Sequence, residues 1–159
     1  MNNLKMKNFR VIGFDADDTL WVNEPYYQET EKKFCDLLSE YMPAEEISRE
    51  LLLVEKLNLE LYGYGTKAFM LSMIETALRI TNCNVSSSVI SSVILLGKQQ
   101  LDKPVVLLDG IEETLVRLTK NGIKIILASK GDLLDQERKL AKSNIAKYFH
   151  HIEIMSEKK

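Results

Sequence analysis

The sequence predicts an α/β protein with a doubly wound parallel β-sheet and a block of helices inserted into it. Two observations support this fold class. Apolar, β-branched runs at residues 9–14 and 123–128 each end abruptly in polar residues, which is typical of buried parallel strands. Between them, residues 22–100 show helical spacing and no strand signal. Strands and helices alternate outside this insertion, so we expect ligands at the carboxyl ends of the strands.

The bulk composition excludes several classes of protein. A chain of 159 residues with 45% hydrophobic content has enough apolar material for one core with an inserted subdomain. The net charge of -2 comes from mixed acids and bases, so no basic surface for nucleic acid is predicted. Cys35 and Cys83 are too few for a disulfide framework, and no apolar segment is long enough for a bilayer. We therefore expect a cytoplasmic protein with no nucleic-acid or membrane partner; nothing in the sequence sets the oligomeric state.

The inserted segment should contain four helices. Apolar residues at helical spacing between positions 34 and 41 indicate the first helix, which begins near Tyr26. Pro43 and the acids after it mark the start of the second helix, and Gly63 marks its end. The third helix is predicted for residues 66–80, and Ser86 should cap the fourth.

After the insertion, the chain returns to the sheet. Residues 104–108 are predicted to rejoin the core, and a helix should begin at Gly110 and end at Gly122. Asp132 can cap the helix that follows the second strand. Residues 152–155 are predicted as a third strand.

Three acids follow the first strand directly, and they are the main candidates for chemistry. Asp15, Asp17 and Asp18 lie within four positions and would repel one another without a cation, so the segment favours a hard metal ion such as Mg²⁺. With that charge neutralised, one carboxylate can attack a phosphoryl group and a second can transfer the proton. Thr19 offers a hydroxyl that can stabilise the loop. The alternative is an ordinary acidic surface turn.

The ends of the other strands carry groups that could bind phosphate. Ser129 and Lys130 precede a helix start, where free backbone N–H groups favour anions. Lys158 follows the third strand and could supply positive charge to a phosphate, with Lys159 as the adjacent competitor. The alternatives are a plain serine at a helix start and solvated lysines.

Together these residues resemble the motifs of the haloacid dehalogenase (HAD) superfamily. Residues 15–20 match the first motif, DxDxT, and residues 128–132 resemble the second. Lys158 is the better placed candidate for the lysine of the third motif. The resemblance covers residues 9–22 and 104–159.

The resemblance implies a Rossmann-like core and a role for each matched residue. Asp15 would be the nucleophile and a ligand of Mg²⁺. Asp17 would be the general acid and base, and would bind the metal through its backbone carbonyl. Ser129 and Lys158 would hold the phosphate.

The helical insertion resembles a type 1 cap, which closes over the active site of such enzymes and selects the substrate. We therefore expect a discontinuous core, residues 1–22 and 101–159, and a cap, residues 23–100. The possible cap contacts to substrate are Tyr62, Tyr64, Phe69 and Met70.

The resemblance implies a Mg²⁺-dependent phosphatase that hydrolyses a small phosphorylated metabolite through an aspartyl-phosphate. Dehalogenases of the superfamily typically lack the second aspartate, so Asp17 favours a phosphatase; dehalogenase, phosphonatase and phosphomutase activities remain alternatives. The fourth, acidic motif of the family is absent from this chain, and we expect a core shortened at its carboxyl end. A catalytically weak binding module is therefore a further hypothesis.

A signalling receiver domain also uses strand-end acids and Mg²⁺. It would need an acceptor aspartate after a strand some forty residues downstream, about one or two βα units. That region is predicted to be helical and offers Glu55 and Glu60 instead, which disfavours this hypothesis.

Overall fold

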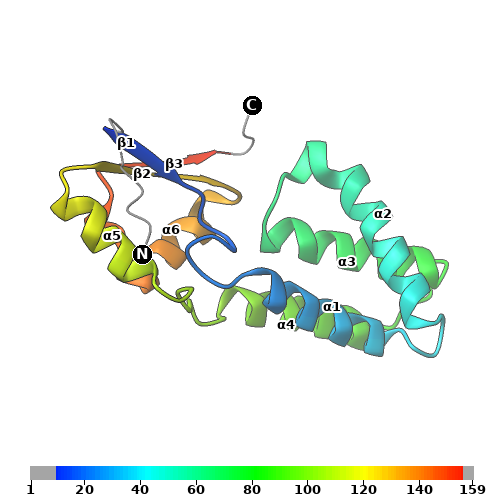
Figure 1. The fold of residues 1–159 in the computed structure, drawn as a ribbon. Helices are drawn as coiled ribbons and strands as arrows, with labels where there is room; N and C mark the ends of the chain where they lie inside the picture. The colour runs from blue at the N-terminus through cyan, green and yellow to red at the C-terminus, as the bar shows by residue number, and fades with distance from the viewer. Residues whose placement is uncertain (1–9, 156–159) are drawn as a thin grey trace.

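The computed structural model describes residues 10–155, which form a sheet with its helices and a separate group of four helices (Figure 1). The strands are β1 (Val11–Phe14), β2 (Lys124–Lys130) and β3 (His151–Met155). All pairs are parallel, and β2 lies between β1 and β3. The prediction of a parallel, Rossmann-like α/β fold is confirmed.

The alternation of side chains along β2 determines how the sheet is covered. Ile125 and Leu127 are buried, whereas Ile126 on the opposite face is half-buried. The buried face packs against α5 (Ile111–Lys120) and α6 (Leu133–Ser143), which both lie on the same side of the sheet in Figure 1. A short 3₁₀ turn then leads from α6 to β3. Because successive residues of a strand face opposite sides, this one strand supplies the centre of the core.

The four inserted helices form a second apolar cluster of their own. They are α1 (Glu24–Leu37), α2 (Ala44–Tyr62), α3 (Thr66–Ile80) and α4 (Ser87–Leu101). Phe34, Leu51, Met73 and Val93 come one from each helix, and all four are at most 1% exposed. The insertion is therefore a packed unit and not an extended loop.

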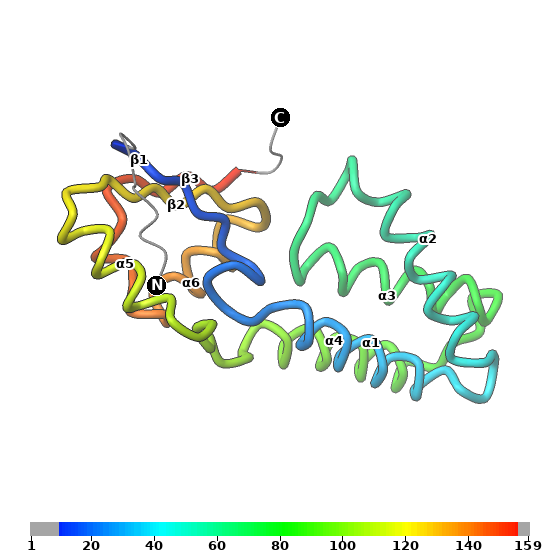
Figure 2. Tube along the Cα trace, in the orientation of Figure 1, coloured from blue at the N-terminus to red at the C-terminus, as the bar shows by residue number. Residues whose placement is uncertain are grey.

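Two antiparallel segments connect the two units. The backbone N–H of Val22 donates to the carbonyl of Val106 at 2.9 Å, and that of Leu108 donates to Leu20 at 2.9 Å. Trp21 and Leu107 form an isolated bridge between them. The chain thus leaves and re-enters the sheet unit at one place, which Figure 2 shows at the base of α1 and α4.

Most of the predicted helix boundaries agree with the structure. Ser86 and Asp132 each cap their helix through a side-chain oxygen, as predicted. The first helix begins at Glu24, two residues before the predicted start, because the Asp18 carboxylate accepts the backbone N–H groups of Asn23 and Glu24. It ends at Leu37, earlier than predicted.

The end of β2 differs from the prediction. The strand was expected to stop at residue 128, but Ser129 and Lys130 continue it and pair with Ile154 and Met155. Pairing with β3 supplies the long-range hydrogen bonds that keep these two polar residues in extended backbone. The second motif therefore begins within a strand.

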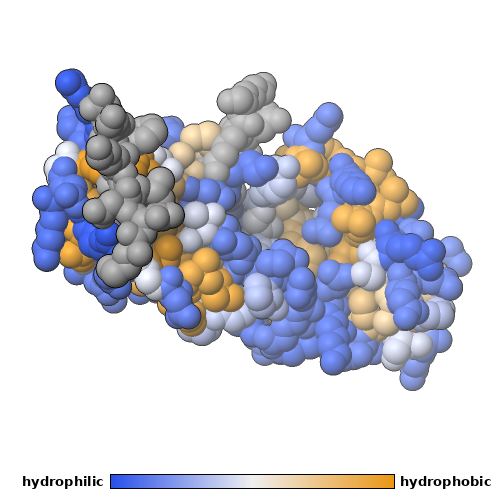
Figure 3. Space-filling view, viewed as in Figure 1, coloured by the Kyte–Doolittle hydropathy of each residue, from blue (hydrophilic) through white to orange (hydrophobic). Residues whose placement is uncertain are grey.

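None of the helices in residues 10–155 is long and apolar enough to cross a membrane. On the face shown in Figure 3, apolar surface of the helical unit lies over α2, at the upper right. Leu61 illustrates it with 79% exposure.

Shortening a buried side chain on the central strand tests the core. Leu127→Ala should destabilise the protein by about 2–5 kcal/mol, because the side chain is 1% exposed and its removal leaves a cavity under α5 and α6. Urea unfolding followed by circular dichroism measures this loss. The matched Leu61→Ala variant should stay within about 0.5 kcal/mol of wild type. Equal losses in the two variants would contradict the assignment of β2 as the centre of the core.

Candidate active site

A cavity of about 510 Å³ lies between the carboxyl ends of β1 and β2 and the helical unit. Asp15, Asp17 and Lys130 line its sheet side. The opposite wall comes from α2, α3 and the loop between them, and includes Glu55, Asn58, Tyr64 and Phe69. The first motif and the end of the second therefore face one cavity, as expected for parallel strands.

The Asp17 carboxylate is held by three donors. Trp21 Nε1 donates to Oδ1 at 2.8 Å, and Lys139 Nζ donates to the same oxygen at 3.0 Å. Gln136 Nε2 donates to Oδ2 at 2.8 Å. Both oxygens of the half-buried carboxylate are thus engaged, which fixes its plane.

The other residues of the first motif have different roles. Asp15 lies one residue beyond β1, is exposed, and lines the cavity. Asp18 adopts a left-handed backbone conformation (φ 56°), and its carboxylate caps α1. Its role is therefore structural. Thr19 is exposed and its backbone N–H donates to the Ala16 carbonyl at 3.2 Å within the turn.

The candidates for phosphate binding differ in whether they line the cavity. Ser129 is 1% exposed, and its hydroxyl donates to Gln136 Oε1 at 3.1 Å, which connects it indirectly to Asp17. Lys130 lines the cavity, with its ammonium 3.7 Å from the ring centroid of Tyr64. Lys158 lies outside the described residues.

Sequence reasoning missed the contribution of α6. Its first two turns point Asp135, Gln136 and Lys139 at the acidic loop. Burial raises the pKa of Asp135, which is 4% exposed and lies 3.8 Å from the Lys139 ammonium. The available signal was an acid and a lysine four residues apart on the helix after the second motif, a spacing that puts both on one face.

The helical wall contains one unpaired acid. The Glu55 carboxylate is half-buried and has no hydrogen bond or ion pair with any residue from 10 to 155. Burial raises its pKa from 4.5 to about 7, and the nearby carboxylates of Glu31 and Glu24 add to the shift. Near neutral pH, Glu55 is therefore only partly ionised.

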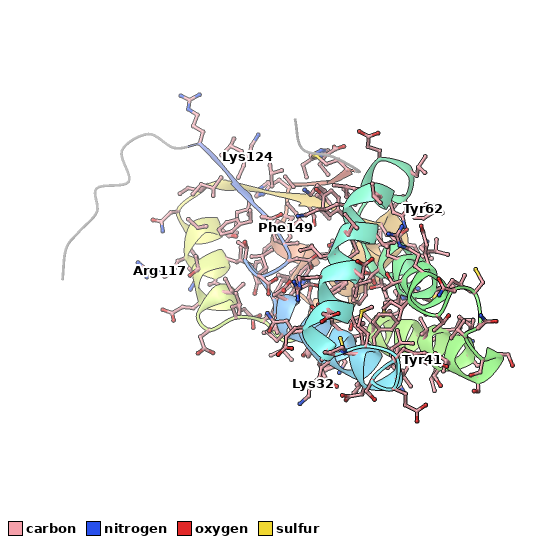
Figure 4. The ribbon with its side chains drawn as sticks, turned by 90° about the vertical axis from the view of Figure 1, so that its right-hand side faces the viewer. Lys32, Tyr41, Tyr62, Arg117, Lys124 and Phe149 are labelled. Carbon is pink, nitrogen blue, oxygen red and sulfur yellow. The ribbon has the colours of Figure 1, made fainter. Side chains whose placement is uncertain are left out.

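Two of the four suggested cap contacts line the cavity. Tyr64 and Phe69 do, whereas Tyr62 and Met70 are not part of its wall. Figure 4 looks onto the helical unit and shows Tyr62 at the upper end of α2, where its side chain is 47% exposed. Met70 packs instead in the apolar cluster of the helices.

The donor set of the acidic loop suits a hard cation only in part. Asp15 and Asp17 place carboxylate oxygens on one cavity wall, the ligand type that Mg²⁺ prefers. Within residues 10–155, however, no group of three or more acids, histidines or cysteines is arranged to hold a metal. Because hydrogen bonds occupy the Asp17 carboxylate, its backbone carbonyl is the better candidate ligand.

Comparison with known proteins identifies the family. A family model for haloacid dehalogenase-like hydrolases matches residues 9–159, nearly the whole chain. The chain therefore belongs to the haloacid dehalogenase-like hydrolases. A comparison with curated proteins gave no match.

Solved structures share the fold. A haloacid dehalogenase-like hydrolase from Xanthomonas campestris is 37% identical with a TM-score of 0.88, and the match covers 94% of this chain and 63% of that one. An L-2-haloacid dehalogenase from Xanthobacter autotrophicus with covalently bound chloropropionic acid is 15% identical (TM-score 0.57; 92% and 57% covered). A HAD hydrolase from Bacillus subtilis bound to magnesium is 12% identical (TM-score 0.57; 93% and 66% covered). The chain thus spans less than two thirds of each of these proteins.

Removal of the unpaired charge should stabilise the protein at alkaline pH. Between pH 4.5 and 7, folded Glu55 keeps a proton that the unfolded chain has lost, so its contribution to stability declines as the pH rises through 7. At pH 8, the free energy of unfolding of Glu55→Gln should therefore be up to about 1 kcal/mol higher than that of wild type, after allowance for solvent screening. Urea unfolding at pH 8 and pH 4.5 measures the difference, which should disappear at pH 4.5.

The control for this experiment is Glu60→Gln, an exposed position on the same helix. It should leave the free energy of unfolding nearly unchanged at both pH values. A destabilised Glu55→Gln variant at pH 8 would contradict the assignment of Glu55 as a desolvated acid.

Proposed function

We propose that this hydrolase is a Mg²⁺-dependent phosphatase of small phosphomonoesters that works through an aspartyl-phosphate. The observation that carries the proposal is the pair of carboxylates in one cavity, with Asp15 exposed to it and Asp17 fixed by three donors. This arrangement separates an exposed candidate nucleophile from an oriented proton carrier. The magnesium in the Bacillus subtilis hydrolase supports the choice of metal.

The chemistry would proceed in two steps. An Asp15 oxygen attacks phosphorus, the bond from phosphorus to the leaving oxygen breaks, and Asp17 gives its proton to that oxygen. Water then attacks the aspartyl-phosphate, the bond from phosphorus to the Asp15 oxygen breaks, and Asp17 takes the proton of the water. Bound Mg²⁺ would neutralise negative charge on the phosphoryl group. Lys130, on the cavity wall, is placed to attract the phosphate.

The same geometry favours phosphate over halide chemistry. A halide leaves without needing a proton, whereas an alkoxide leaving group needs one at neutral pH. Asp17, which three donors orient at the cavity wall, can supply that proton. This argument supports the phosphatase hypothesis over the dehalogenase alternative.

Loss of the nucleophile should abolish turnover. Asp15→Asn should lower Mg²⁺-dependent phosphate release at least about 1,000-fold, because an amide cannot form the acyl phosphate. Phosphate release from a generic phosphomonoester, with and without Mg²⁺, measures the loss, and hydroxylamine-labile phosphate on the chain reports the intermediate. The matched Asp109→Asn variant changes an exposed acid outside the cavity and should behave as wild type. Wild-type activity in Asp15→Asn would overturn the mechanism.

Lys139 should act as a positioning residue. Its ammonium contacts Asp17 at 3.0 Å and Asn23 Oδ1 at 2.8 Å, so Lys139→Gln should let the proton carrier move. We expect kcat to fall about 100-fold with little change in KM, and Lys139→Arg to recover part of the loss. Steady-state kinetics separates the two constants. A rise in KM alone would instead make Lys139 a phosphate ligand, and the exposed Lys142→Gln should change neither constant.

A further inference from the structure

The helical wall of the cavity has a chemistry that the proposed hydrolysis does not use. Glu55 projects from α2 into the same cavity that Asp15 and Asp17 line from the sheet side. The proposed phosphoryl transfer takes place at the sheet wall, and Glu55 lies on the opposite wall, where the organic part of a bound phosphomonoester would be. Glu55 is therefore placed to recognise what the phosphate is attached to.

Most of the groups around Glu55 are apolar or negative; Arg49 lines a neighbouring surface depression together with Glu55, but its Nε donates to the Glu45 carbonyl. Leu52 and Leu59 on its own helix and Phe69 on α3 line the cavity beside it. Its closest charged influences are the carboxylates of Glu31 and Glu24, both on α1. A desolvated carboxylate among other acids is best stabilised by a cation.

None of the residues from 10 to 155 forms an ion pair with Glu55. Lys56 also lines the cavity, but it adjoins Glu55 in the helix, and adjacent helical residues do not face one another. The structure shows no ion pair between them. Glu55 thus lowers the stability of the fold above its pKa with no compensating ion pair from residues 10–155, which is the behaviour expected of a residue kept for a ligand.

We propose that Glu55 binds an ammonium group of the substrate, so that the preferred substrate is a small phosphomonoester with an amine at the end opposite its phosphate. This inference rests on the proposed phosphatase function and adds the substrate class. A cavity of about 510 Å³ is of the size that holds such a small molecule, with the phosphate at Lys130 and the amine at Glu55. Glu55 would then be a specificity-determining residue with no part in the bond-breaking steps.

Binding of two isosteric probes tests the proposal without requiring turnover. The probes are 3-aminopropylphosphonate and butylphosphonate, which differ only by an ammonium in place of a methyl group and lack the ester bond. Isothermal titration calorimetry with Mg²⁺ at pH 8, where Glu55 is ionised and the amine is protonated, gives both dissociation constants. Wild type should bind the amino probe about tenfold more tightly.

Two variants decide the origin of that preference. Glu55→Gln should bring the ratio of dissociation constants close to one. Glu60→Gln, on the exposed side of α2, should keep the tenfold ratio. Both variants retain the length and shape of the side chain, and Glu55→Gln removes an unfavourable charge, so both should fold.

The remaining outcomes separate the two hypotheses. If both probes bind wild type equally, or if the preference survives in Glu55→Gln, the role of Glu55 is overturned and the phosphate site stands. If butylphosphonate does not bind at all, the proposed phosphate site fails, and the inference that rests on it fails too.

Discussion

The hydrogen bonds to the Asp17 carboxylate are the interaction on which the rest of the structure depends. They come from the loop after β1, through Trp21, and from α6, through Gln136 and Lys139. One carboxylate therefore joins a loop to a helix some 120 positions further along the chain, and Lys139 extends the connection to Asn23 at the start of α1. These hydrogen bonds therefore fix the acidic loop, α6 and the start of α1 relative to one another.

The same region also determines how the helical unit meets the sheet. Lys67 at the start of α3 forms an ion pair with Asp132 at 2.8 Å, and Lys130 lies over the Tyr64 ring. Gly65 has φ 118°, and a Cβ there would lie 3.1 Å from the Cβ of Asp132. Glycine is thus needed both for the backbone conformation and for the close approach. These contacts keep the α2–α3 loop against the sheet ends, so that the cavity has two walls.

The parts of the structure that sequence could predict are those set by local interactions. Ser86 and Asp132 cap helices through residues three positions away, and the strand signals depend on runs of a few apolar residues. The burial of Ser129 could not be predicted in the same way, because it requires the pairing of β2 with β3 and a hydrogen bond from Ser129 to Gln136. The role of Lys139 depends on a contact with Asp17 across 122 positions. Local patterns thus predicted which loops hold the candidate catalytic residues. Tertiary contacts determine which other side chains contact those residues.

The two walls of the cavity differ in how far their charged groups are paired. On the sheet wall, each oxygen of Asp17 has its donors, and the geometry is set by strands and a helix start. On the helical wall, Glu55 is desolvated and has no ion pair with any residue from 10 to 155, which lowers stability near neutral pH. A fully satisfied group keeps its position whatever molecule enters, whereas an unsatisfied group gains free energy only from a ligand of the right charge. A single substitution on the helical wall should therefore alter the choice of ligand without disturbing the proposed site of phosphoryl transfer on the sheet wall.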